Sequence, residues 1–184
     1  MGHHTFDVDR ADALEDPGRF RYCSAEELIA ALAASPDAVV ADLGSGTGFY
    51  TDAVAPHVGT CYAVDVQSAM HDLYREKGLP ANVETLTAGV GELPLADDAL
   101  DAAFSTMTYH EYAGEAALAE LARVVRPGGR VVTVDWSRHA AGDAGPPTAE
   151  RFGVGDAATA FADAGFAVER AATRRETFVC VARR

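Results

Sequence analysis

The sequence predicts an α/β protein built as a three-layer α/β/α sandwich, in which helices cover both faces of a mainly parallel sheet. Short runs rich in β-branched residues alternate along the chain with segments of helical periodicity, which is the pattern of βαβ units. The 184 residues lie within the range of a single domain, and no break in composition divides them. The last two strand-like runs follow each other directly, as in an antiparallel hairpin.

The first half of the chain is expected to contain an arm and two βα repeats. Residues 1–22 are polar, rich in Asp and without clear periodicity, so the domain itself is expected at 23–184. Ser24 precedes Glu27 by three positions, the spacing of a capping box at the start of a helix. The predicted elements are a helix at 25–34, a strand at 38–43, a helix at 49–56, a strand at 60–66 and a helix at 68–78.

The second half continues the alternation and ends in the hairpin. The segment at 115–127 is strongly amphipathic and is stopped by the Arg-Pro-Gly-Gly run at 126–129. Its apolar face consists of Ala117, Leu118, Leu121, Val124 and Val125. The other predicted elements are strands at 82–88, 99–106 and 130–136, a loop at 137–147, a helix at 148–165, and hairpin strands at 166–173 and 176–183.

The chain is strongly acidic, with 28 Asp and Glu against 15 Lys and Arg and a net charge of −13. Such a surface repels phosphate backbones, which argues against nucleic acid as a partner. Lys77 is the single lysine among the bases. Dense carboxylates with almost no lysine are also typical of salt-adapted proteins, in which the charge maintains solubility. Composition therefore leaves two explanations of the acidity open, partner choice and a halophilic source.

Compartment and metal content can be judged from the apolar runs and the cysteines. No apolar run approaches the roughly 18 residues of a membrane span, and no signal-peptide pattern is present, so the expected location is the cytoplasm. Cys23, Cys61 and Cys180 are far apart and form no CxxC pair. We therefore expect neither a disulfide framework nor a metal site. Cys61 and Cys180 lie in strand-like runs and are expected in the core.

Residues 39–51, VVADLGSGTGFYT, place glycines at 44, 46 and 48 directly after a strand that is expected to be buried. In open α/β sheets, ligands bind beyond the carboxyl ends of strands, where glycine allows close approach and the next helix offers free N–H groups. Asp65 closes the next strand about 20 residues after Gly44, a spacing at which a carboxylate accepts both ribose hydroxyls. These positions predict a ligand that contains a nucleoside.

The detail of the loop narrows the choice of ligand. A dinucleotide fingerprint requires G-x-G-x-x-G, and Phe49 stands where the third glycine would be. Asp42, two residues ahead of Gly44, is a poor neighbour for a pyrophosphate and a good one for an ammonium group. A nucleoside that carries an amino acid is therefore favoured, and a nicotinamide oxidoreductase is disfavoured.

With these residues the chain resembles class I S-adenosylmethionine-dependent methyltransferases, and among them the type-11 branch that is similar to ubiquinone and menaquinone methyltransferases. The resemblance covers residues 23–184 and rests on four motifs in order: VVADLGSGTGFYT, CYAVDVQSAM, DAAFST and LARVVRPGGRVVTVDW. It implies a Rossmann-like sheet of seven strands with an antiparallel last strand. It also implies S-adenosylmethionine as the methyl donor, with S-adenosylhomocysteine as the product.

The resemblance assigns the parts of the cofactor to individual positions. Asp42 and the backbone of Gly44 to Gly46 would hold the methionine moiety, and Asp65 would hold the ribose hydroxyls. Tyr50 would lie near the carboxylate or the sulfonium, where an aromatic ring favours a cation.

The adenine is expected beside Val66 and Met70. Relatives often carry an acid after the third strand that contacts the adenine amino group, whereas residues 88–91 are Ala-Gly-Val-Gly here. Only the backbone can then meet the adenine edge, which lowers the expected affinity. The residues expected to bind the cofactor are Asp42, Leu43, Gly44, Ser45, Gly46, Tyr50, Asp65, Val66, Met70, Gly89, Val90, Gly91 and Ser105.

The candidates for catalysis lie at 106–112, TMTYHEY, directly after the fourth strand. A methyl group on a sulfonium has a good leaving group, so an enzyme has to align the reactants, exclude water and, where needed, remove a proton. His110, with an ordinary pKa of about 6.5, suits a general base. Glu111 or Tyr109 could orient it. The alternative is that His110 caps a helix or packs under the loop, with Glu111 in solvent.

Two further segments are expected near the acceptor. Asp135 and Trp136 close the fifth strand at the same edge of the sheet, although Trp136 is equally consistent with simple packing. Phe20, Arg21 and Tyr22 place two aromatic rings in an otherwise polar arm. As in relatives, this arm is expected to fold over the cofactor as a lid.

The predicted function is methyl transfer to a small molecule, because the compact chain leaves little room for an added substrate domain and no basic groove marks an RNA enzyme. The alternative is a non-catalytic module that binds S-adenosylmethionine or S-adenosylhomocysteine as a regulator. The missing adenine acid favours the module slightly, whereas Asp42 and Asp65 argue against it. The sequence leaves the acceptor and the oligomeric state open.

Overall fold

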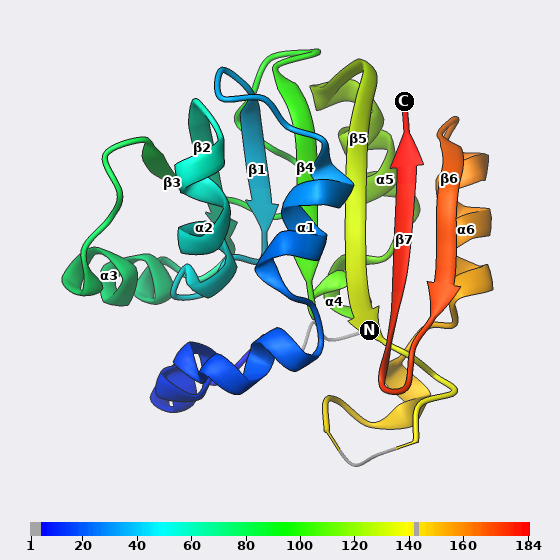
Figure 1. The fold of residues 1–184 in the computed structure, drawn as a ribbon, viewed down its shortest axis with the longest axis horizontal. Helices are drawn as coiled ribbons and strands as arrows, with labels where there is room; N and C mark the ends of the chain where they lie inside the picture. Colours follow the sequence, from blue (N-terminus) through cyan, green and yellow to red (C-terminus); the bar gives the residue numbers. More distant parts are fainter. Residues whose placement is uncertain (1–4, 142–143) are drawn as a thin grey trace.

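A computed structural model describes residues 5–141 and 144–184 as an α/β/α sandwich around a seven-stranded sheet of order β3-β2-β1-β4-β5-β7-β6 (Figure 1). Neighbouring strands are parallel except at β7, which runs antiparallel to both β5 and β6. The predicted fold class is confirmed. The strands are β1 (Val39–Leu43), β2 (Thr60–Asp65), β3 (Val83–Thr87), β4 (Leu100–Thr106), β5 (Val125–Trp136), β6 (Ala167–Thr173) and β7 (Thr177–Arg183).

The helices form the two outer layers. Those before and between β1, β2 and β3 cover one face, and α5 and α6 cover the other (Figure 1). The α-helices are α1 (Ala25–Leu32), α2 (Phe49–Val54), α3 (Ser68–Lys77), α4 (Tyr109–Tyr112), α5 (Glu115–Val124) and α6 (Val154–Asp163). The 3₁₀ helices are η1 (Val8–Glu15), η2 (Pro17–Arg21), η3 (Ala55–His57) and η4 (Thr148–Glu150).

The buried apolar side chains form two clusters, one on each face of the sheet. Val40 belongs to the cluster under α1 and α2, whereas its neighbour Ala41 belongs to the cluster under α5. Successive side chains of a strand point to opposite faces, so a strand covered on both faces must be apolar throughout. This requirement explains the short β-branched runs of the sequence.

The strand order reverses between β1 and β4, which pair in parallel from Val40 opposite Ala102 to Asp42 opposite Phe104. Parallel strands bring their carboxyl ends to one edge, and ligand sites of open α/β sheets lie where the order reverses. The arm formed by η1 and η2, and the segment that links β5 to α6, lie beyond this same edge (Figure 1).

Two local predictions concern helices, namely the start of α1 at Ser24 and the buried face of α5. Ser24 Oγ accepts a hydrogen bond from the Glu27 N–H at 3.2 Å, so Ser24 caps α1 as expected. The Glu27 carboxylate forms ion pairs with Arg170 and Arg174, in place of the reciprocal bond of a capping box. The predicted apolar face of α5 is confirmed as buried.

Two segments expected without regular structure contain short helices. In the described part of the arm, η1 and η2 begin where Asp7 and Asp16 accept hydrogen bonds from the N–H groups two residues ahead. The segment at 106–112 contains α4 instead of a continuous loop. Met107 precedes it in the left-handed region at φ +59°, which turns the chain from β4 into the helix.

Two further boundaries lie elsewhere than predicted. β5 begins at Val125, five residues early, because the Arg-Pro-Gly-Gly run continues the strand across an irregularity opposite Leu100 and Ala102. The helix expected at 148–165 divides into η4 and α6, and α6 starts at Val154. The Gly153 N–H donates to Asp156 Oδ2 at 2.7 Å, which fixes this start.

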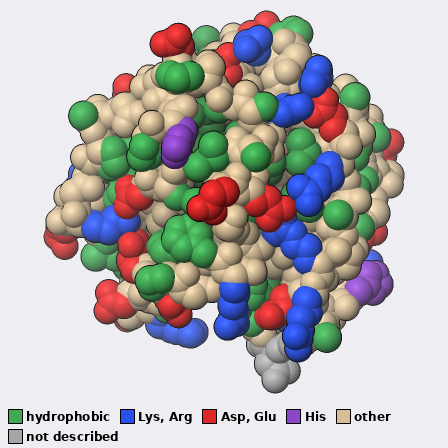
Figure 2. All heavy atoms as spheres, in the orientation of Figure 1, with side chains coloured by type: hydrophobic (Ala, Val, Ile, Leu, Met, Phe, Trp, Pro, Cys, Tyr) green, Lys and Arg blue, Asp and Glu red, His purple; other side chains and the backbone are tan. Residues whose placement is uncertain are grey.

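Charges of both signs share the surface. On the face shown in Figure 2, Asp and Glu side chains lie among Lys and Arg side chains. Within residues 5–141 and 144–184, no helix combines the length and apolar character of a membrane span. The same residues contain no group of three or more His, Cys, Asp and Glu placed to hold a metal ion. All three cysteines are free and buried, as expected for the two in strands.

Candidate active site

The glycine loop after β1 is held against its neighbours by close packing. The N–H groups of Gly44 and Ser45 donate to the Val64 carbonyl at 2.8 and 2.9 Å. Gly44 has φ +75°, and a Cβ there would lie 2.2 Å from Thr108 Cγ2. A Cβ on Gly48 would lie 2.1 Å from the Tyr74 ring. Both positions therefore require glycine for the approach of protein side chains, independently of any ligand.

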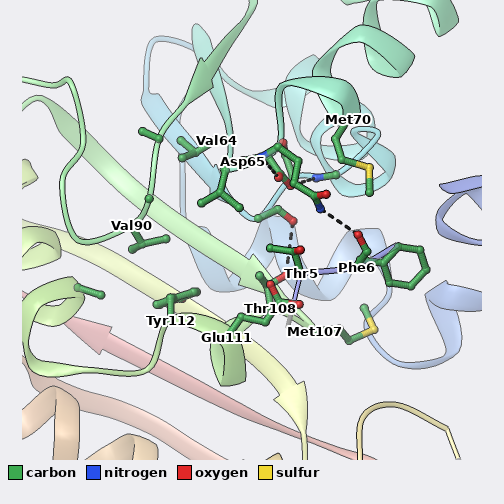
Figure 3. A pocket seen from close by; sticks show the side chains of 18 of the residues that line it. Thr5, Phe6, Val64, Asp65, Met70, Val90, Met107, Thr108, Glu111 and Tyr112 are labelled. Atoms are coloured by element: carbon green, nitrogen blue, oxygen red, sulfur yellow. Dashed lines mark hydrogen bonds between the residues drawn. The ribbon is translucent and has the colours of Figure 1, made fainter. Parts of the chain in front are cut away.

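Asp65 is the last residue of β2 and faces the glycine loop. Its Oδ2 accepts from the Gly46 N–H and its Oδ1 from the Gln67 N–H, each at 2.9 Å. Each carboxylate oxygen keeps a further lone pair, and the side chain lines a cavity (Figure 3). Asp65 thus orders the loop and offers hydrogen-bond acceptors to a diol.

Three buried polar atoms beside the loop lack a hydrogen-bond partner among the described residues: Asp42 Oδ1, Ser45 Oγ and Arg19 Nε. Asp42 Oδ2 accepts from Thr51 Oγ1 at 2.7 Å. Burial raises the pKa of Asp42 to about 7 and lowers the pKa of Arg19, and the charges of these two groups partly offset each effect. An unpaired buried polar group costs about 1–3 kcal/mol. An α-amino acid moiety supplies an ammonium for Asp42 and a carboxylate for Arg19, so these residues fit the methionine end of S-adenosylmethionine.

The cavity beside Asp65 has a volume of about 430 Å³ and extends from the glycine loop along the ends of β2 and β3 (Figure 3). Its lining includes the apolar side chains of Val66, Met70, Ala88 and Val90, together with Tyr112 from α4. These side chains suit a flat ring. Since Val90 stands in the loop after β3, an adenine amino group would find its acceptors on the backbone.

The arm covers part of this cavity. The Phe6 carbonyl accepts from Gln67 Nε2 at 3.0 Å, and Glu15 pairs with Lys77 at 3.1 Å. The Tyr50 hydroxyl donates to the Arg19 carbonyl at 2.9 Å. The arm residues that line the cavity are Thr5, Phe6, Leu14 and Arg19. The arm is therefore fixed to the glycine loop and to α3 at several points.

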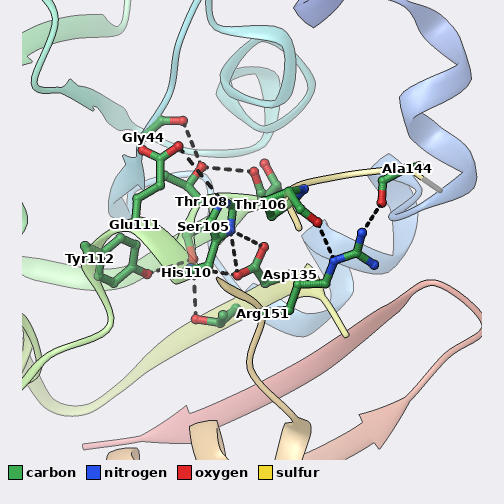
Figure 4. Close-up of polar contacts among 12 residues, drawn as sticks. Gly44, Ser105, Thr106, Thr108, His110, Glu111, Tyr112, Asp135, Ala144 and Arg151 are labelled. Atoms are coloured by element: carbon green, nitrogen blue, oxygen red, sulfur yellow. Dashed lines mark hydrogen bonds and ion pairs between the residues drawn. The ribbon is translucent and has the colours of Figure 1, made fainter. Parts of the chain in front are cut away.

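His110 on α4 is bound to the end of β5 (Figure 4). Its Nδ1 lies 3.0 Å from Asp135 Oδ1, and its backbone N–H donates to Asp135 Oδ2 at 2.7 Å. A neutral His110 that donates from Nδ1 leaves Nε2 as an acceptor, 4.0 Å from Glu111. Burial lowers the pKa of His110, but the hydrogen bond and charge of Asp135 outweigh it, so the pKa is raised above its ordinary value.

A second cavity of about 520 Å³ lies next to the first and contains His110 in its wall. The two cavities share Met107 and Glu111, together with the arm residues Thr5, Phe6, Leu14 and Arg19. Trp136 and Tyr22 contribute aromatic rings to the second cavity, with ring centroids 4.7 Å apart. The imidazole therefore lies in the wall of a second cavity, which shares lining residues with the cavity beside Asp65.

The structure brings most of the predicted site residues together. Those that line the first cavity are Gly44, Ser45, Gly46, Asp65, Val66, Met70, Gly89, Val90, Gly91 and Glu111. Asp42, Leu43, Tyr50 and Ser105 are buried behind the wall. Ser105 Oγ accepts from the Tyr112 hydroxyl at 2.8 Å and so supports a lining residue.

The structure adds residues that the sequence did not single out for these roles. Asp135, and not Glu111 or Tyr109, bonds to the His110 ring at Nδ1; Tyr109 is buried among aromatic rings. Leu14 and Arg19 enter the site from the arm. His110 and Asp135 meet because β4 and β5 pair in parallel, so that their ends are neighbours. The arm residues carry no signal of their role in the sequence.

Comparison with known proteins agrees with this geometry. Residues 41–133 match the model of the methyltransferase domain family. A SAM-dependent methyltransferase from Aquifex aeolicus superposes with a TM-score of 0.87 at 31% identity, over 96% of this chain and 98% of that chain. The fold and the site thus define the class of S-adenosylmethionine-dependent methyltransferases. This chain belongs to the methyltransferase domain family.

Curated relatives carry several names. Demethylmenaquinone methyltransferase of Mycobacterium sp. (strain JLS) is 34% identical over 112 residues, which cover 60% of this chain and 47% of that protein. Malonyl-[acyl-carrier protein] O-methyltransferase of Methylococcus capsulatus is 36% identical over 100 residues, which cover 52% of this chain and 36% of that protein. The matches span less than half the length of these relatives.

Proposed function

We propose that this chain transfers the methyl group of S-adenosylmethionine to a small-molecule acceptor bound in the second cavity, with His110 as the general base. The observation that carries the proposal is the place of His110, which is held by Asp135 in the wall of that cavity, next to the cofactor cavity. A base at this junction can take the proton of an acceptor O–H, N–H or S–H group as the methyl group is transferred.

Each side of the site has a defined task. The bound cofactor supplies an electrophilic methyl group on a sulfonium. Ser45 and Arg19, which line the cavity, would hold the methionine end, with the buried carboxylate of Asp42 behind the wall to balance its ammonium charge, and Asp65 would hold the ribose. Asp135 fixes the Nδ1 proton of His110, so that Nε2 accepts the acceptor's proton. Phe6, Leu14 and Met107 border both cavities and exclude water from the space between them.

The direct test is a transfer assay with S-adenosylmethionine labelled in the methyl group. The acceptors are a panel of hydroxyl, amine and thiol compounds small enough for the second cavity. Label in an acceptor, together with stoichiometric S-adenosylhomocysteine, would support the proposal. Binding of S-adenosylhomocysteine without transfer to any acceptor class would favour the second candidate, a non-catalytic module that responds to the cofactor. The loop at Val90, without an acid for the adenine, is the observation that favours the module.

We propose that the arm acts as a lid, and we expect removal of residues 1–22 to weaken S-adenosylhomocysteine binding about tenfold or more. The deletion removes Arg19 and Leu14 from the cavity wall, and with them a charge-assisted hydrogen bond of about 1.5–3 kcal/mol. Calorimetric titration measures the change. Arg19→Ala in the full chain should reproduce much of the loss, whereas Arg175→Ala, an arginine outside both cavities and outside the arm, should not. Equal affinity of the truncated and full chains would refute the lid.

We propose a salt-rich, reducing cytoplasm as the setting of the protein, supported by its three free thiols and its net charge of −13. The expected result is an unfolding temperature that rises steadily with KCl concentration, because salt screens the repulsion between carboxylates. Thermal unfolding followed by circular dichroism measures it. Near the sequence pI of about 4.7 the same salt series should have little effect. Full stability in dilute buffer at pH 7, unchanged by salt, would contradict the halophilic explanation.

A further inference from the structure

The arginines and the single lysine of this chain fall into two groups, those with and those without a carboxylate partner. Most of them form ion pairs with carboxylates: Arg75, Lys77, Arg123, Arg126, Arg130, Arg138, Arg170, Arg174, Arg183 and Arg184. Among the described residues, the bases without such a pair are Arg10, Arg19, Arg21, Arg151 and Arg175. In a chain with almost twice as many acids as bases, an arginine without an acid partner stands out.

Four of these five arginines belong to the second cavity. Arg10, Arg19 and Arg21 line it from the arm. Arg151 is buried and supports the opposite wall, because its Nε donates to the Pro146 carbonyl at 2.8 Å and its Nη2 to the Ala144 carbonyl at 2.7 Å. Arg175 lies in the turn between β6 and β7, outside the cavity.

Neither Arg10 nor Arg21 is committed to an acidic partner. The Arg10 guanidinium lies 5.9 Å from the centre of the Phe6 ring, and Arg21 bonds to the Tyr22 hydroxyl. Asp16 also lines the cavity, but its Oδ1 accepts from the Gly18 N–H at the start of η2. The donors of Arg10 and Arg21 therefore remain open to a ligand on the arm side.

Two of the three carboxylates that line the cavity lie on the side of His110, and the third, Asp16, lies among the arginines of the arm. The two are Glu111 and Glu150, and both act with Asp135 to raise the pKa of His110. The cavity is thus polarised, with negative charge around the imidazole and net positive charge on the arm. An acceptor that places a proton donor at His110 would place any anionic group at Arg10 and Arg21.

We propose that the acceptor is an anionic hydroxy compound, whose carboxylate or phosphate is bound by Arg10 and Arg21 while its hydroxyl faces His110. Phe6, Tyr22 and Trp136 also line this cavity and suit a flat apolar body between the two ends. The assignment rests on the proposed function, since it names the acceptor class of that site. Guanidinium groups bind both carboxylate and phosphate through paired N–H donors, so the shared chemistry is an oxyanion.

The test is calorimetric titration of the protein saturated with S-adenosylhomocysteine, in a phosphate-free buffer of low salt. The probes are 4-hydroxybenzoate for a carboxylate, 4-hydroxyphenyl phosphate for a phosphate, and phenol without an anion. We expect one or both anionic probes to bind about tenfold or more tightly than phenol. The double variant Arg10→Ala/Arg21→Ala should lose this advantage. Arg175→Ala removes one unpaired arginine outside the cavity and should keep it.

The outcomes separate this assignment from the proposed function. If S-adenosylhomocysteine binds but no anionic probe binds better than phenol, the acceptor assignment is wrong and the cofactor site stands. The acceptor assignment is also wrong if the anionic probes still bind more tightly than phenol in the double variant. It is wrong as well if Arg175→Ala abolishes this difference in affinity. If S-adenosylhomocysteine itself does not bind, the proposed function fails and the acceptor assignment fails with it. The stronger of the two anionic probes identifies the source of the oxyanion.

Discussion

Replacement of Asp65 by alanine is expected to weaken the binding of S-adenosylhomocysteine about 100-fold or more. The carboxylate would lose two charge-assisted hydrogen bonds to the ribose, each worth about 1.5–3 kcal/mol, and about 1.4 kcal/mol corresponds to a factor of ten. The variant also loses the bonds to the Gly46 and Gln67 N–H groups, which loosens the loop. Calorimetric titration gives the dissociation constant.

Asp72 on α3 provides the matched control. Its carboxylate is largely exposed and pairs with Arg75, so Asp72→Ala makes the same change of charge away from the cavity. The affinity of this variant should stay within about twofold of the wild type, because an exposed ion pair contributes about 1 kcal/mol or less to stability and none to the site. Thermal unfolding of both variants reports on the fold. If the folded Asp65→Ala protein binds S-adenosylhomocysteine with wild-type affinity, Asp65 does not contribute to the cofactor site.

His110→Ala is expected to lower kcat about 100- to 10,000-fold, the usual range for loss of a general base. The affinity for S-adenosylhomocysteine should change little, because His110 lines the second cavity and not the first. The measurement is methyl transfer to the acceptor that the labelled assay identifies. His139→Ala is the matched histidine control, since His139 lines neither cavity. A His110→Ala enzyme with kcat within twofold of the wild type would show that His110 is not the general base.

The pH dependence gives a readout that a merely structural role of His110 would not produce. A base must be neutral to accept a proton, so kcat should rise with pH through the raised pKa of His110 and then level off. Asp135→Asn removes the negative charge that raises this pKa, so the midpoint should move to lower pH. A profile that is the same in both enzymes would contradict the His110–Asp135 pairing.

The sheet could be predicted because its strands have to be apolar on both faces. Runs such as 38–43 and 60–66 contain few residues that tolerate exposure, and the structure places strands within a residue or two of these bounds. The start of β5 differs from the prediction because Pro127 and Gly128 indicate a break, whereas Val125 pairs with Leu100 of β4 and the backbone of Gly128 and Gly129 is hydrogen-bonded to Arg184. Tertiary pairing outweighs local propensity there.

The cofactor site was predictable to the extent that it is local in sequence. The glycine loop and Asp65 follow neighbouring strands, so spacing alone brings them together. His110 and Asp135 meet only because β4 and β5 are adjacent and parallel, which the sequence does not state. The contribution of Arg19 depends on the path of the arm, which is set by contacts such as that between Phe6 and Gln67. Long-range contacts of this kind have no sequence signature.

The central claim is that the cavity between the glycine loop and Val90 binds the methyl donor, and the most direct measurement is calorimetric titration of the wild-type protein with S-adenosylhomocysteine. We predict one site per chain, a negative heat-capacity change from burial of the adenine, and a higher unfolding temperature in the presence of the ligand. The absence of binding heat, together with an unchanged unfolding temperature at millimolar ligand, would contradict the account.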